Sequence, residues 1–130
     1  MAGFLIGLTF AAVLVAAART VGFDRDAAFY PTVLVVIALL YVLFAVEDGG
    51  SAVVAWEVAV AAVFVAVAVA GYKRNEWWLV VGYAAHGLYD VAHGGHSVNT
   101  GVPLWWGGFC LGVDGAIAAY LAVRARQTAV

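Results

Sequence analysis

Ionisable side chains interrupt several apolar stretches of this sequence, at Glu57, His86, Asp90 and Asp114. His86, Asp90 and His93 are spaced i, i+4 and i+7, so a helix would present all three on one face. Imidazole nitrogens and carboxylate oxygens are common ligands of zinc, iron and other divalent ions. The spacing therefore predicts a metal site made of His86, Asp90, His93 and Asp114, although HxxxDxxH is less specific than a motif such as HExxH.

The same residues support other interpretations. In one, His86, Asp90, Asp114 and Glu57 are catalytic without a metal, because a histidine oriented by a carboxylate can donate or accept a proton. In another, they relay protons or bind a cation during transport. In a third, they only form hydrogen bonds between helices. A haem with one axial histidine is a further alternative, whereas two facing axial histidines are not expected, since all three histidines lie within residues 86–96.

The composition indicates the environment of these residues. Of the 130 residues, 66% are apolar and 11% are charged, and the mean hydropathy is +1.01. Soluble domains usually have about 25% charged residues, so lipid must surround most of this surface. The net charge of −2 gives no indication of a nucleic-acid partner, and the single cysteine, Cys110, excludes an internal disulfide.

Five apolar segments approach or reach the length of about 17–25 residues that a helix needs to cross a bilayer. The apolar runs are continuous, without the two-residue alternation of barrel strands, which favours helices. The sequence thus predicts an all-α bundle of five transmembrane helices in a single domain, residues 1–130. The first segment ends in small residues as a signal peptide does, but it lacks a basic start, so we expect a retained span. The predicted spans are residues 3–18, 30–46, 51–71, 77–93 and 103–123.

The basic residues predict the orientation of the helices. All six follow the first, third or fifth predicted span, which places them on one side of the membrane; they are Arg19, Arg25, Lys73, Arg74, Arg124 and Arg126. The positive-inside rule makes that side cytoplasmic, with the N-terminus outside and the C-terminus inside a plasma or inner membrane. At about 1.5 Å per residue, Glu57, His86, Asp90 and Asp114 then fall in the outer half of their spans. We therefore expect a polar site that opens to the extracytoplasmic side.

Glycines predict close packing around the last span. Gly108 and Gly112 form a GxxxG step, which lets helix backbones approach each other. That face would serve either packing within the bundle or contact in a homo-oligomer. Membrane lipids are the other expected partner. Gly94, Gly95, Gly101 and Pro103 shape the predicted outer loop, which could cover a cavity.

Two stretches resemble a group of short multi-pass bacterial membrane proteins that have no assigned function. The stretches are FYPTVLVVIALLYVLFAV and HGLYDVAHGGHSVNTGVPLWWGGFCLGVDGAIAAYLA, a little under half of the chain. The group pairs an HGxxDxxH element with a VPxWW…FC…D element, and it often has proline where this chain has Gly107. The resemblance implies an integral membrane protein and supplies no substrate, cofactor or reaction. The matching residues are His86, Asp90, His93, Trp105, Trp106, Cys110 and Asp114.

Together these features predict a small membrane protein whose His/Asp/Glu site performs metal- or acid/base-assisted chemistry on a lipid-soluble molecule. A proton- or cation-linked transporter or channel is one alternative, and an accessory subunit of a larger membrane complex is another. The inner half of the predicted spans has no charged residue, which counts against a transport path.

Overall fold

The computed structural model describes residues 1–48, 50–96 and 99–128, without the side chains of residues 48 and 94–96. In this part of the chain all regular secondary structure is helical, which confirms the predicted all-α class and the number of long helices. The elements are α1 (Ala2–Val21), the 3-10 turn η1 (Phe23–Arg25), α2 (Phe29–Asp48), α3 (Ser51–Lys73), α4 (Trp77–His96) and α5 (Trp106–Thr128).

Eight of the ten helix ends differ from the predicted ones, by one to five residues. Helix α1 continues to Val21 and ends at Gly22, whose φ of 98° suits glycine and whose N–H donates to the carbonyl of Ala18. Helix α4 continues through the two glycines to His96, so these glycines do not end it. Helix α5 begins at Trp106, because Pro103 lies in the preceding turn and accepts the Trp106 N–H at 2.9 Å.

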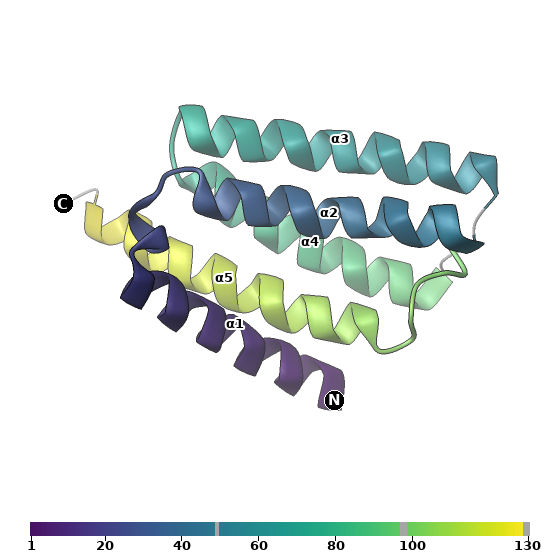
Figure 1. Cartoon of the computed structure of the whole chain (residues 1–130), viewed down its shortest axis with the longest axis horizontal. Helices are drawn as coiled ribbons and strands as arrows, with labels where there is room; N and C mark the ends of the chain where they lie inside the picture. The colour runs from purple at the N-terminus through teal and green to yellow at the C-terminus, as the bar shows by residue number, and fades with distance from the viewer. Residues whose placement is uncertain (49, 97–98, 129–130) are drawn as a thin grey trace.

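Successive helices run in opposite directions along the bundle (Figure 1). Helix α5 packs against α1 and α4, while α3 packs against α2 and α4. In the described residues, no Cα atom of α2 comes within 8 Å of a Cα atom of α1 or α5. The bundle therefore has an open seam between α2 on one side and α1 with α5 on the other.

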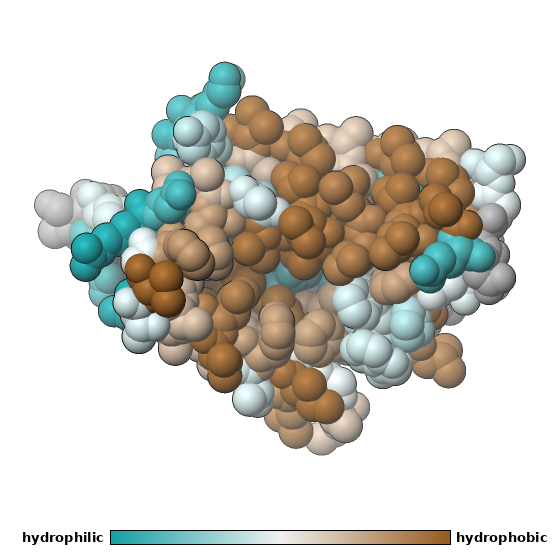
Figure 2. Space-filling view, in the orientation of Figure 1, coloured by the Kyte–Doolittle hydropathy of each residue, from teal (hydrophilic) through white to brown (hydrophobic). Residues whose placement is uncertain are grey.

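Because the helices alternate in direction, the C-terminal ends of α1, α3 and α5 lie at one end of the bundle, together with η1 (Figure 1). All six basic residues belong to these segments or follow them directly, so we call this the basic end; the opposite end, with His93 and Asn99, is the histidine end. Figure 2 shows a broad hydrophobic surface between the two more hydrophilic ends. This is the surface expected of a protein whose middle is surrounded by lipid.

Four helices are long and apolar enough to cross a membrane: Ala2–Val21, Phe29–Glu47, Ser51–Lys73 and Trp106–Thr128. Helix α4 has 20 residues but is not one of these four helices. It carries three polar residues, His86, Asp90 and His93. It packs against both α3 and α5, so these polar residues lie inside the bundle. The chain is a multi-pass helical membrane protein; its orientation stays a prediction.

Glycines of α1 and α5 allow these helices to pack at backbone distance. A Cβ added at Gly112 would lie 2.4 Å from the carbonyl oxygen of Phe4, and one added at Gly7 would overlap the Phe109 carbonyl. Gly112 is buried, whereas Gly108 is exposed. The structure therefore uses Gly112 for packing within the chain, and a homo-oligomer through the Gly108/Gly112 face stays a prediction.

An ionic network joins four segments at the basic end. Arg124 of α5 donates to Asp24 of η1 at 3.0 Å and also binds Glu76, which precedes α4. Asp24 accepts further hydrogen bonds from Tyr30 and Tyr120, both at 2.8 Å. Partial burial works against ionisation of Asp24, but these hydrogen bonds and the charge of Arg124 lower the pKa of its carboxyl group. The network fixes η1 against α2, α4 and α5.

Candidate functional site

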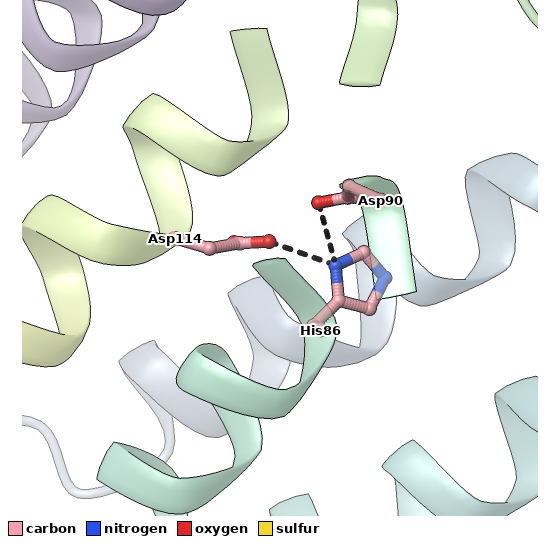
Figure 3. A group of neighbouring side chains, drawn as sticks. All are labelled: His86, Asp90 and Asp114. Atoms are coloured by element: carbon pink, nitrogen blue, oxygen red, sulfur yellow. Dashed lines mark hydrogen bonds and ion pairs between the residues drawn. The ribbon is translucent and has the colours of Figure 1, made fainter. Parts of the chain in front are cut away.

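The centre of the site is a buried cluster of three ionisable residues, which we call the triad: His86, Asp90 and Asp114. The two α4 residues are four apart, so they lie on one face, and α5 places Asp114 opposite them (Figure 3). The Nδ1 atom of His86 lies 2.8 Å from Oδ2 of Asp114 and 3.4 Å from Oδ2 of Asp90. His86 is 1% exposed and both aspartates are 0% exposed.

Small residues let α4 and α5 approach closely enough to form the triad. A Cβ at Gly87 would lie 3.4 Å from the Cβ of Asp114, and a Cβ at Gly107 would lie 2.9 Å from the carbonyl oxygen of Asp90. The second distance is shorter than ordinary contact, so a larger residue at 107 would push α5 away from α4. The glycines thus belong to the geometry of the site.

Aromatic side chains enclose the triad. Tyr41 of α2 donates its hydroxyl hydrogen to Oδ1 of Asp90 at 2.5 Å. The ring of Phe64, on α3, packs against the His86 ring with a centroid distance of 4.7 Å. Cys110 is buried nearby as a free thiol. The cluster is therefore shielded from bulk water on the α2 and α3 sides.

Three polar atoms of the triad have no hydrogen-bond partner among the described residues: Nε2 of His86, Oδ2 of Asp90 and Oδ1 of Asp114. Buried polar atoms are usually paired, so each unpaired atom requires an explanation such as a bound ion or ligand. Each of the three residues has a potential ligand atom, and these three atoms lie within 4.8 Å of one another. The triad can therefore hold a metal ion.

Charge also bears on what the triad holds. With both aspartates ionised and His86 protonated, the three side chains have a formal charge of about −1, and burying an unbalanced charge is costly. A neutral His86, two carboxylates and a divalent cation sum to about zero. One additional proton shared by the carboxylates gives the same sum. The site therefore suits either a divalent ion or a proton that moves among its members.

Glu57 and His93 form a second cluster toward the histidine end. The two side chains meet at 2.6 Å, between Nε2 of His93 and Oε1 of Glu57. Tyr89 donates to Oε2 of Glu57 at 2.8 Å, and Asn99 donates its amide hydrogen to Oε1 at 3.0 Å. Glu57 is 1% exposed, whereas the His93 side chain is 11% exposed. This cluster lies closer to the surface than the triad.

The predicted ligand set is therefore divided between two places. The structure brings His86, Asp90 and Asp114 together, but it directs His93 to Glu57 on α3. Helix α4 directs the side chain of His93 toward α3, where the Glu57 carboxylate accepts a hydrogen bond from the His93 ring. Tyr83, three residues before His86, donates its hydroxyl hydrogen to the carbonyl of Tyr30 at 2.7 Å.

Tyr41 connects the two clusters. Its hydroxyl binds Asp90, its ring contacts the His93 ring edge-to-face at 4.7 Å, and its carbonyl accepts an Asn99 amide hydrogen at 3.1 Å. The sequence pattern did not identify Asn99 or Tyr89 as site residues. Tyr89 lies between His86 and His93 in HGLYDVAH, and this position is the one signal in the sequence that could have marked it as a site residue. Asn99 follows α4 in a loop whose path the pattern does not specify.

The predicted lid, the loop from residue 94 to residue 102, lies partly outside the described residues. Its described part contacts α2 closely, since a Cβ at Gly101 would overlap the carbonyl of Phe44. Asn99 in the same loop is 2% exposed. This loop segment therefore covers the Glu57/His93 cluster at the histidine end.

Comparisons with protein-family models, with curated proteins and with solved structures found no match to this chain. The resemblance to short bacterial membrane proteins stays a prediction. The chemistry of the buried triad is consequently the basis on which a function can be proposed.

Proposed function

We propose that this membrane protein holds a divalent metal ion at the triad and that the ion assists chemistry on a lipid-soluble molecule. The observation that carries the proposal is the convergence of His86, Asp90 and Asp114 inside an apolar bundle, with ligand atoms within 4.8 Å of one another. Ionisable groups at this depth are costly to bury and usually mark functional sites.

The donor set fits a catalytic ion better than a structural one. One imidazole nitrogen and two carboxylate oxygens are hard or borderline donors, suited to zinc, iron or manganese. Three protein ligands leave at least one position for a substrate or water, whereas structural zinc sites are usually closed by four. A bound ion would act as a Lewis acid on a substrate oxygen.

The residues around the triad would orient its side chains and exchange protons with the exterior. The Tyr41 hydroxyl binds one oxygen of Asp90; the other, 3.4 Å from Nδ1 of His86, has no hydrogen-bond partner among the described residues and is available to an ion. Partners of this kind fix the position of a metal ligand and commonly change metal affinity about 10–100-fold when removed. The Glu57/His93 cluster, near the surface at the histidine end, would exchange protons with the exterior; positive-inside orientation makes this the extracytoplasmic side.

A metal-free acid–base site is the second candidate, and one contact favours it. His86 Nδ1 lies 2.8 Å from Asp114, the distance at which a carboxylate orients an imidazole. The Nε2 atom would then exchange the substrate proton. However, Nε2 has no hydrogen-bond partner among the described residues and belongs to a buried ring that packs against Phe64. The metal proposal also accounts for the convergence of two carboxyl groups on one imidazole, and it is preferred.

Metal analysis of the purified protein tests the proposal. We expect one ion per chain after chelation and reloading with Zn²⁺, Mn²⁺ or Fe²⁺. His86→Ala should lose it, because a ligand to the ion is removed. His93→Ala is the matched control, a histidine on the same helix but outside the triad, and should retain the ion. A wild-type protein without stoichiometric metal, or equal binding by both variants, would refute the metal site.

A further inference from the structure

The open seam of the bundle contains an apolar groove of about 330 Å³ that reaches Asp114 of the triad. Its walls come from α1, α2 and α5, and they expose no nitrogen or oxygen atom. Figure 2 shows a hollow in this part of the surface, with a hydrophilic floor between hydrophobic walls. The lining residues are Phe10, Leu14, Thr32, Val33, Val36, Ile37, Leu40, Trp106, Phe109, Cys110, Val113 and Asp114.

The groove is elongated along the helices. Its α2 residues span Thr32 to Leu40 and its α5 residues span Trp106 to Asp114, a separation of eight helical steps in each case. At 1.5 Å per residue, both walls are about 12 Å long. A groove with this shape and direction accommodates an extended hydrocarbon chain that lies parallel to the lipid chains beside it.

Hydrocarbon is also the occupant that the surroundings favour. The groove lies within spans whose outer surface is apolar, so the molecules available to it are lipid-soluble. Water is disfavoured in a cavity without polar partners, and an empty groove would lose the dispersion contacts of its walls. Moving a chain from lipid into an apolar groove brings little hydrophobic gain, so selectivity must come from polar atoms along the groove.

Two such atoms are available on α5. Oδ1 of Asp114 and Nε1 of Trp106 are both buried without a hydrogen-bond partner among the described residues. Both residues line the groove, but neither atom is exposed on its wall, so a ligand that binds this acceptor or donor must displace neighbouring side chains. None of the twelve lining residues is basic and one of them is Asp114, so an anionic headgroup would meet a carboxyl group there. A neutral polar group such as a hydroxyl or carbonyl suits these atoms.

We infer that the groove binds a neutral, single-chain, lipid-soluble molecule whose polar group reaches Asp114. This inference rests on the proposed function, because it identifies the substrate class of the same site. The molecule enters laterally from the bilayer between α1 and α2. The bond that reacts must therefore lie near the polar group of this molecule, at the depth of the triad. The molecule itself has no charged headgroup.

Photolabelling in lipid nanodiscs tests the inference with two probes. The first is a long-chain alcohol that carries a diazirine in its chain, and the second is a phosphatidylcholine with the same diazirine in one acyl chain. We expect the alcohol to label Val113, which is 4% exposed and lines the groove. The phospholipid should label exposed positions such as Leu39 instead. Absence of alcohol labelling at Val113, or equal labelling there by both probes, would overturn the inference.

A pair of variants on α2 provides the matched control. Val36 lines the groove, whereas Leu39 is similarly exposed but outside the lining. Val36→Trp should fill the groove and reduce labelling of Val113 about tenfold, equivalent to a loss of about 1.4 kcal/mol of binding. Leu39→Trp should leave the labelling unchanged. If both variants change labelling equally, the probe reached Val113 by another route and the inference fails.

The metal content of the same samples separates the two proposals. Val113 labelling in a protein that never binds metal would refute the metal site and leave the groove assignment standing. A protein that binds metal at His86 but is not labelled at Val113 would refute the groove assignment alone. The wild-type comparison of the two probes decides the groove even if Val36→Trp does not fold.

Discussion

Replacing Gly112 with alanine tests the contact that builds one wall of the groove. The added methyl group would lie 2.4 Å from the Phe4 carbonyl and 2.9 Å from the Leu8 amide nitrogen. Ordinary contact starts at 3.4 Å, so α1 must retreat by 3.4 minus 2.4, or 1.0 Å. Both obstacles are backbone atoms, so the whole helix has to move.

The magnitude follows from two opposing effects. Overpacking of this kind costs about 1–3 kcal/mol. Alanine in place of a helical glycine contributes about 0.5–1 kcal/mol in the other direction. Gly115, on the same helix, has nothing within 4 Å of an added Cβ, so Gly115→Ala shows the second effect alone. The difference in unfolding free energy between the two variants should therefore be about 1–3 kcal/mol, with Gly112→Ala the less stable.

The assay is reversible unfolding in mixed micelles with increasing SDS, at several protein concentrations. Equal stability of the two variants would mean that α1 does not pack on α5 at Gly112. A dependence of the Gly112→Ala effect on protein concentration would instead place Gly112 between chains. The packing within one chain predicts no such dependence.

Two further predictions concern hydrogen-bonded carboxylates. Tyr41→Phe removes the donor to Asp90 and leaves another buried oxygen unpaired, which should cost about 1–3 kcal/mol of unfolding free energy in the same assay; an unchanged value would show that this hydrogen bond contributes nothing. The pKa of Asp24 is lower in the folded protein than its usual 3.8, so its contribution is present above pH 3.8 and is lost as the pH falls through the folded pKa. Thermal unfolding should thus be insensitive to Asp24 from pH 7 to about pH 5, and Asp24→Asn should reduce the loss of stability below pH 4. A variant with the wild-type acid profile would contradict this role.

The number of helices and their class were predictable because they depend on local composition. Apolar runs between charged turns are continuous in the chain, and lipid requires backbone groups to be paired within each run. The boundaries were less predictable. Helix α1 extends past its predicted end to include Arg19, and α4 extends to include Gly94 and Gly95. Charged residues and glycines are tolerated at helix ends near the membrane surface.

The triad was predictable only in part. The spacing of His86 and Asp90 is a property of one helix, and Asp114 was a candidate because it interrupts an apolar run. Which groups converge depends on how far each helix is rotated, and that is set by packing. Packing directs His93 to Glu57 and brings Tyr41 to Asp90 across 49 residues.

The sequence by itself determined that this chain is a helical membrane protein with costly polar groups in its spans, because composition and length alone fix those properties. Only the tertiary structure decided that α2 stands away from α1 and α5, which leaves an apolar groove beside Asp114. The position of a seam follows from side-chain volumes and backbone approaches at Gly7 and Gly112, and these are properties of helix pairs. No pattern within one segment contains them.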